Sequence, residues 1–123
     1  MDIYAYWRSV LTQDAEALKT FFTPDAYINW HNTNEHFTAG EFVLANCRYP
    51  GSWEGSVERV ETIGSLLITA VHVFSADPPL SFHVTSFIQV REDMICGIDE
   101  YWGDDGLPPQ WRRELGLGSP ILR

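Results

Sequence analysis

Hydrophobic residues in the first 22 positions recur at the spacing of an α-helix. Steps of three and four place them on one helical face, made of Ile3, Trp7, Val10, Leu11, Leu18, Phe21 and Phe22. Asp14 interrupts that face. We expect Asp14 to cap a second short helix after a bend near Gln13, because its carboxylate can accept the free N–H groups of a first turn. The alternative is a buried acid.

A second helix start follows a short hairpin-like segment. Residues 26–30 alternate like a strand, and 35–37 can return beside them. Thr38 and Glu41 then form a Thr-x-x-Glu capping box, flanked by Phe37 and Phe42. The helix is expected to end near residue 47 or 48, before Tyr49-Pro50-Gly51.

The rest of the chain alternates between apolar strands and short turns. Strands are expected at 54–63, 66–74, 81–90 and 94–102. Connections this short favour antiparallel neighbours. The order predicts one α+β domain over residues 1–123, with helices packed on one face of a curved sheet. The tail after Gly103 is expected to be an ordered extension that packs on the body or on a partner.

Composition narrows the set of partners. Hydrophobic residues make up 45% of the chain, aromatic residues 14%, and the net charge is −9. This charge disfavours nucleic acid and anionic membranes.

There is no signal-peptide pattern and no apolar stretch of the roughly 20 residues that span a bilayer. Cys47 and Cys96 are isolated, which favours reduced thiols and a cytoplasmic location.

Three stretches resemble the nuclear-transport-factor-2-like (NTF2-like) superfamily, and within it the polyketide-cyclase-like (SnoaL-like) group. They are residues 13–18 continuing into 21–26, Asn29-Trp30-His31 with 37–42, and 94–104. The resemblance implies a cone-shaped antiparallel sheet wrapped around N-terminal helices. It also implies a pocket for a small, largely apolar molecule, and commonly a homodimer through the outer face of the sheet.

The last strand supplies the first candidate for chemistry. Strand alternation puts Ile98, Glu100 and Trp102 on one face. The resemblance implies that a carboxylate of this strand points into the cone, which fits Glu100, with Asp104 at the rim. Burial among rings raises a carboxyl pKa and suits a general acid or base. The alternative is a structural or solvent-facing Glu100.

Other candidates come from the neighbouring strands. His72 and His83 flank the loop near Asp77 and are expected to lie opposite each other. We expect either to partner Glu100 in acid–base chemistry. His83, Thr85 and Phe87 share a face that resembles a ligand wall. The resemblance turns Trp30 and Asn32 inward as a wall and an edge donor, although core packing is the simpler role for Trp30.

No nucleotide-binding loop or nucleophile elbow occurs, and no cofactor is expected. The leading hypothesis is therefore binding of a small, largely apolar molecule, with cofactor-free isomerisation, cyclisation or dehydration as the associated chemistry. The alternative is a non-catalytic ligand-binding or dimeric interaction module. A third reading places a metal on His72, His83 and Glu100, but the sequence lacks metal-binding spacings, and no metal is expected.

Overall fold

The computed structural model describes residues 1–122. The elements in chain order are α1 (Ile3–Leu11), α2 (Ala15–Leu18), a short 3-10 helix (Lys19–Phe21), β1 (Phe22–Trp30), β2 (Glu35–Thr38), α3 (Ala39–Cys47), β3 (Trp53–Ile63), β4 (Leu66–Ala76), β5 (Pro79–Arg91), β6 (Met94–Asp104) and α4 (Gln110–Glu114). Two α-helices precede the first strand, a third separates β2 from β3, and a short helix follows the last of six strands.

The helix starts agree with the sequence-based expectation. Gln13 adopts a positive φ of 54° at the bend, and the Asp14 carboxylate accepts a hydrogen bond from Ala17 N at 3.1 Å. At α3, Thr38 Oγ1 accepts from Glu41 N at 3.2 Å, and Glu41 Oε1 accepts from Thr38 N at 2.9 Å. Both ends of the predicted capping box are therefore formed.

The strands form one curved, unclosed sheet in the order β2-β1-β6-β5-β4-β3. All neighbours are antiparallel except β1 and β6, which run parallel. The expected antiparallel meander therefore describes β3 to β6, and β1 joins it by a parallel contact that the sequence did not reveal. Pro24 and Asp25 lie within β1. A register shift between Phe22 and Tyr27 accommodates the proline.

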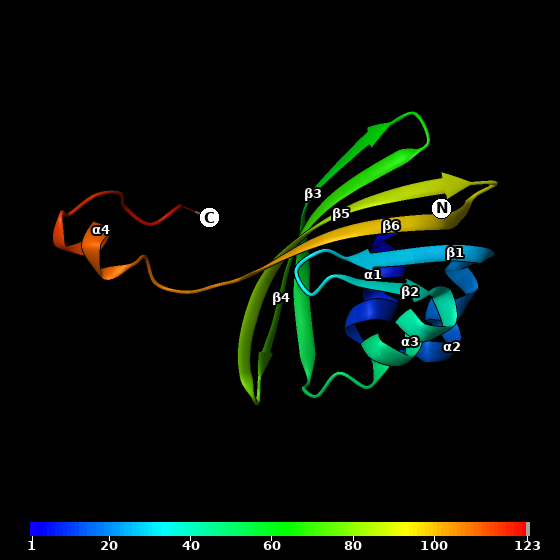
Figure 1. Cartoon of the computed structure of the whole chain (residues 1–123), viewed down its shortest axis with the longest axis horizontal. Helices are drawn as coiled ribbons and strands as arrows, with labels where there is room; N and C mark the ends of the chain where they lie inside the picture. Colours follow the sequence, from blue (N-terminus) through cyan, green and yellow to red (C-terminus); the bar gives the residue numbers. More distant parts are fainter. Residues whose placement is uncertain (123) are drawn as a thin grey trace.

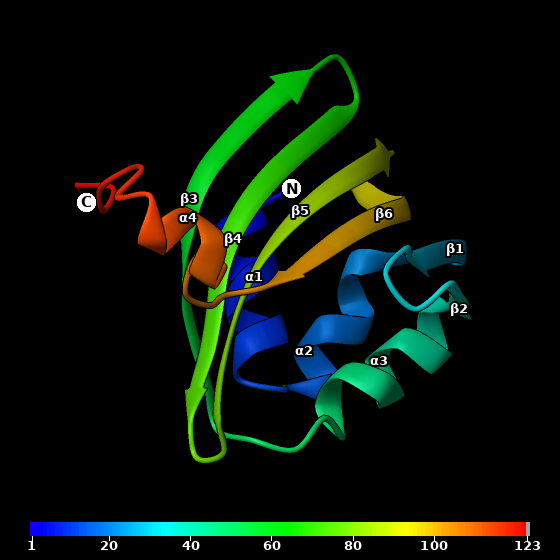
Figure 2. The same ribbon diagram turned by 60° about the vertical axis from the view of Figure 1, so that its left-hand side comes forward.

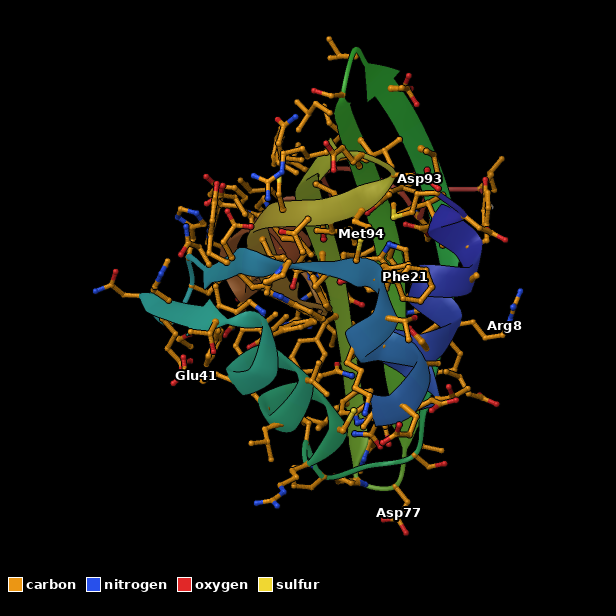
Figure 3. The ribbon with its side chains drawn as sticks, turned by 90° about the vertical axis from the view of Figure 1, so that its right-hand side faces the viewer. Arg8, Phe21, Glu41, Asp77, Asp93 and Met94 are labelled. Carbon is orange, nitrogen blue, oxygen red and sulfur yellow. The ribbon has the colours of Figure 1, made fainter. Side chains whose placement is uncertain are left out.

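The sheet curves around α1, α2 and α3, and we call the side that faces them the inner face (Figures 1 and 2). Arg8 on α1 points away from the sheet toward solvent (Figure 3). The core lies between helices and sheet and includes the fully buried Trp7, Tyr6 and Leu18. Trp7 Nε1 donates to Thr69 Oγ1 at 3.2 Å, which ties α1 to the inner face of β4.

The two edges of the sheet and the C-terminal segment differ in exposure. β2 has four residues and β3 has eleven, with a bulge between Val57 and Arg59. Residues 105–122 leave on the side of the sheet opposite the helices, where α4 stands apart from the body (Figures 1 and 2). Trp111 on α4 is 57% exposed, so in this chain the tail does not pack its largest side chain onto the body. Among the described residues, no helix is long and apolar enough to cross a membrane.

Candidate functional site

A cavity of about 490 Å³ opens on the inner face, between α1, the end of α3 and the sheet. Its wall is mostly aromatic and aliphatic: Trp30, Tyr49, Trp53, Phe82, Trp102, Val10, Leu11 and Val73. Its polar lining consists of Asn32, Thr33, Glu35, Asn46 and Asp104. A volume of this size with apolar walls and few polar groups is typical of small-molecule sites.

The aromatic walls support one another through edge contacts. Trp102 meets Trp30 and Phe82 with ring centroids 6.5 and 5.9 Å apart, both close to perpendicular. Trp53 contacts Tyr49 at 5.4 Å and Phe82 at 6.0 Å. Aromatic pairs in this range are favourable beyond their buried area. The wall is therefore a continuous set of rings from β1 across to β3.

Glu100 lies behind this wall. It is 1% exposed and is not among the residues that line the cavity. Its Oε1 accepts a hydrogen bond from Trp30 Nε1 at 3.0 Å, and its Oε2 accepts one from the Ser86 hydroxyl. Trp30 therefore contacts the acid with its indole N–H and also borders the cavity.

Burial raises the pKa of the Glu100 carboxyl above its ordinary value, because the charged form loses its hydration. Contacts with Ser86, Trp30 and Trp102 oppose this rise by stabilising the carboxylate. Tyr6 is also fully buried, and its pKa lies well above the usual value through burial and through the charge of Glu100. The Tyr6 hydroxyl has no hydrogen-bond partner within residues 1–122.

Asn32 positions Trp102 at the cavity. Its side-chain carbonyl accepts from Trp102 N at 2.5 Å, and its amide donates to Trp102 O. Asn32 thereby continues the pairing of β1 with β6 beyond the last strand residue. Its amide is engaged with the backbone, so its main effect on the cavity is to fix the Trp102 wall.

The predicted ligand-binding residues divide between the two faces of the sheet. Trp30, Asn32, Trp102 and Asp104 lie at the cavity, and their roles in binding stay a prediction. Thr85 and Phe87 lie on the outer face, where Phe87 contacts Tyr101 with ring centroids 5.9 Å apart. The expected inward orientation of Thr85 and Phe87 is therefore wrong.

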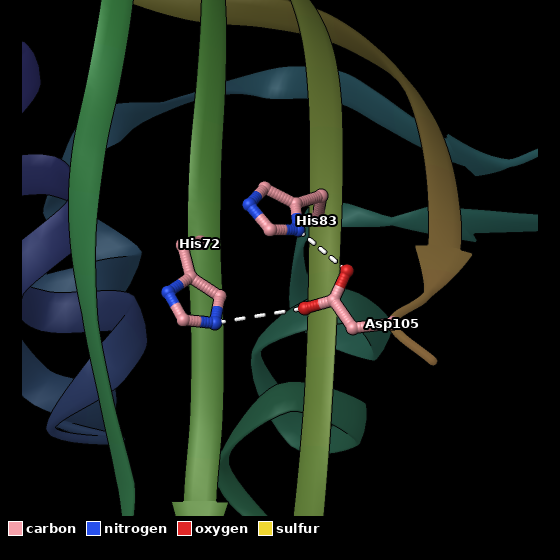
Figure 4. Close-up of side chains that lie close together, drawn as sticks. All are labelled: His72, His83 and Asp105. Atoms are coloured by element: carbon pink, nitrogen blue, oxygen red, sulfur yellow. Dashed lines mark hydrogen bonds and ion pairs between the residues drawn. The ribbon is translucent and has the colours of Figure 1, made fainter. Parts of the chain in front are cut away.

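The expected meeting of Glu100 with a histidine is also wrong. His72 and His83 are directly opposite each other, as expected, but both are on the outer face, where they contact Asp105 (Figure 4). Ser86 is the residue of β5 that faces Glu100 across the strand pair. Since side chains alternate along a strand, His83, three residues earlier, must point to the other side.

Several residues of the site were not anticipated. Val84, Ser86 and Ile88 share one face of β5 and are all buried. This face is more apolar than the one that carries His83, Thr85 and Phe87, and Ser86 is its polar member. That pattern was a usable signal for the inner face. Tyr6 and Asp105 gave no such signal, because their contacts depend on the packing of α1 and on the path of the chain after β6.

Several solved structures share the fold of this chain. A candidate ketosteroid isomerase from Kribbella flavida is 20% identical, with a TM-score of 0.80 over 97% of this chain and 87% of the other. An NTF2-like protein of unknown function from Burkholderia xenovorans is 19% identical, with a TM-score of 0.77 over 97% and 91%. A candidate SnoaL-like polyketide cyclase from Shewanella denitrificans is 8% identical, with a TM-score of 0.68 over 82% and 87%.

No protein-family model matches the chain, and no curated protein matches its sequence. Structural likeness at these identities shows a shared architecture, and the architecture hosts unrelated activities. The curved sheet, the N-terminal helices and these neighbours together show that the chain has the NTF2-like fold, shared with ketosteroid isomerase-like and SnoaL-like proteins.

Proposed function

We propose that the protein binds a small, largely apolar molecule in the cavity on the inner face. The observation that carries this proposal is the aromatic wall formed by Trp30, Trp53, Trp102 and Phe82 around about 490 Å³ of open space. Burying apolar ligand surface against these rings releases roughly 25 cal/mol per Å².

The polar lining favours a neutral or positively charged head group. Glu35 and Asp104 are carboxylates at the cavity, and the whole chain carries a net charge of −9. An anionic ligand is repelled by this field, whereas a cation is attracted by the carboxylates and by the faces of the tryptophans. The indole N–H of Trp53 has no hydrogen-bond partner within residues 1–122, so a ligand carbonyl can accept from it after a small ring rotation.

A fluorescent probe tests the proposal directly. N-phenyl-1-naphthylamine is neutral and apolar and gains fluorescence in an apolar site. We expect saturable binding that Phe82→Ala weakens by about tenfold, because Phe82 is on the cavity wall. Phe87→Ala is the matched control, since Phe87 lies on the outer face of the same strand. Equal affinity in Phe82→Ala, or an equal loss in both variants, contradicts the proposal.

Acid–base catalysis by Glu100 is the second candidate function. The raised pKa of Glu100 and its hydrogen bond to the cavity residue Trp30 favour it. Within residues 1–122, no histidine contacts Glu100, whose partners are Trp30 and Ser86, so it must act alone or through Ser86. Substrate also reaches it only if Trp30 or Trp102 swings aside. A candidate ketosteroid isomerase and an epoxide hydrolase share the fold, which supports an enzyme reading only by analogy.

Carbon-13 NMR of the Glu100 carboxyl separates these two functions. If the acid senses the ligand space, saturating N-phenyl-1-naphthylamine raises its apparent pKa, because the ligand displaces water near the wall. If the titration curve of Glu100 does not change, the residue has only a structural role in the core. Once a substrate is known, Glu100→Gln with full turnover excludes the catalytic role.

We also propose a homodimer through the outer face of the sheet. Phe87 and Tyr101 are 37% and 48% exposed there, and the tail extends on the same side with Trp111 exposed (Figure 2). Tyr101→Glu is expected to convert a dimer to a monomer in light scattering, and Tyr4→Glu on the exposed side of α1 is the control. A wild-type monomer, or a mass unaffected by Tyr101→Glu, contradicts the proposed dimer.

We also propose a cytoplasmic location, supported by the free thiols of Cys47 and Cys96.

A further inference from the structure

The outer face carries a second cluster of chemically active side chains, on the side of the sheet opposite the inner cavity. His72 of β4 and His83 of β5 are direct cross-strand partners. Their rings are stacked with centroids 4.7 Å apart and planes 8° apart. Asp105, the first residue after β6, reaches both rings (Figure 4).

One carboxylate bridges the two imidazoles. Asp105 Oδ1 is 2.5 Å from His83 Nδ1, and Oδ2 is 3.5 Å from His72 Nε2. One ligand atom from each of the three residues lies within 4.8 Å of the other two. We propose that His72, His83 and Asp105 form a binding site for a transition-metal dication of the zinc, cobalt or nickel type.

The surrounding groups resemble the outer shell of a metal site. Glu58 Oε1 is 3.2 Å from His83 Nε2, so it can hold that nitrogen as the N–H and leave Nδ1 for the metal. The Ser81 hydroxyl donates to Asp105 Oδ2 at 2.6 Å and is 3.0 Å from His72 Nε2. Carboxylates and hydroxyls that orient metal ligands in this way are typical of protein metal centres.

The donor set selects the kind of metal. Two imidazoles with one carboxylate suit zinc and its neighbours, whereas magnesium and calcium prefer oxygen ligands alone. Asp105 and Glu58 bring two negative charges that a dication balances. The three ligand side chains are 29–35% exposed, so water completes the coordination in an open site.

Binding requires only side-chain movement. Metal–ligand bonds of about 2.1 Å in a tetrahedron put ligand atoms about 3.4 Å apart. The contact between Asp105 and His83 must therefore open by somewhat under 1 Å, and each ring must tilt so that its lone pair converges on the ion. The terminal torsion of histidine is soft. Asp105 is outside the strand, held to Ser81 O by a single backbone hydrogen bond of 3.0 Å.

Calorimetric titration of tag-free, EDTA-treated full-length protein with Zn²⁺ tests the site, with the visible spectrum of Co²⁺ as an independent readout. We expect one ion per chain and a tetrahedral cobalt spectrum. His72→Asn, His83→Asn and Asp105→Asn should each weaken binding by more than about 100-fold, and Glu58→Gln by about 10- to 100-fold, as for orienting residues.

His31→Asn is the matched control. His31 Nε2 contacts Asp99 Oδ1 at 2.7 Å on another part of the molecule. Within residues 1–122 this histidine–carboxylate pair does not belong to a group of three donor side chains close enough to share one ion. Unchanged zinc binding in this variant supports the proposal. Absence of one-to-one binding by the wild type, or an equal loss in His31→Asn, overturns it. Asp105→Asn nearly preserves shape, and circular dichroism confirms its folding, so the test does not depend on the histidine variants.

Discussion

Ser86 and Glu100 are direct cross-strand partners on the inner face, and the serine hydroxyl donates to a carboxylate that is 1% exposed. Thr69 of β4 is paired with Ser86 on the other side, and Trp30 of β1 is aligned with Glu100. A row of polar groups thus crosses an otherwise apolar interior from β4 to β1. Each member needs its partner, because an unpaired polar group in such a place costs about 1–3 kcal/mol.

Glu100→Gln should change how stability depends on pH. The pKa of Glu100 is raised by folding, so its contribution is fully present below the unfolded value near 4.5 and is lost as pH rises through the folded value. Each unit of pKa difference is worth about 1.4 kcal/mol. Urea unfolding from pH 4.5 to 8 should therefore show a flatter profile for Glu100→Gln than for the wild type. A parallel profile contradicts the raised pKa.

Ser86→Ala should make the stability of the protein depend more steeply on pH, whereas Glu100→Gln makes it depend less steeply. Removing the hydroxyl takes away the strongest group that lowers the pKa of Glu100, so the carboxyl becomes harder to ionise inside the fold. We expect a loss of about 1–3 kcal/mol at pH 7 and a smaller loss near pH 4.5. The same urea series measures both. An equal loss at the two pH values assigns the effect to packing alone.

Thr69→Val tests the link between α1 and the sheet. The valine keeps the shape of the threonine but removes the acceptor of the Trp7 indole N–H, and both residues are buried. The expected cost is about 1–3 kcal/mol in chemical denaturation. Thr85→Val on the outer face of β5 is the control and should be neutral or slightly stabilising. Similar values for the two variants contradict a role for the hydrogen bond.

Gly55→Ala should be the most damaging small change in the sheet. A Cβ at Gly55 meets the backbone oxygen of His72 at 2.3 Å, so β3 and β4 must separate. Overpacking of this kind typically costs about 1–3 kcal/mol and occasionally more. Gly103→Ala, whose nearest heavy atom is 3.9 Å away, should stay within about 0.5 kcal/mol of the wild type. Thermal unfolding of the Gly55→Ala and Gly103→Ala variants measures this difference. Equal melting temperatures for the two variants contradict the prediction.

Local signals in the sequence predicted the local structure well. The bend at Gln13, the cap at Asp14 and the capping box at Thr38 depend only on neighbouring residues, and all are formed. Alternation along β6 also places Glu100 and Trp102 on one face, and Glu100 is buried there. These features need no knowledge of what lies across the strand.

Features that depend on strand register were harder to predict. The set His83, Thr85 and Phe87 contains chemistry-bearing side chains, and this drew the prediction to the wrong face of β5. The pairing of Ser86 with Glu100 decides the face, and pairing joins residues distant in sequence. The parallel contact of β1 with β6, and the approach of Asp105 to the histidines, likewise arise only when the chain is assembled.

The long edge strand β3 determines how the protein behaves among other copies of itself. Its outer edge presents unpaired backbone groups over eleven residues, which is a template for fibre-like growth if the strand is flat and apolar. Here the bulge between Val57 and Arg59 bends that edge, and charged side chains occupy it: Glu54, Glu58, Arg59 and Glu61. The fold therefore keeps an open, unclosed sheet while resisting edge-to-edge aggregation.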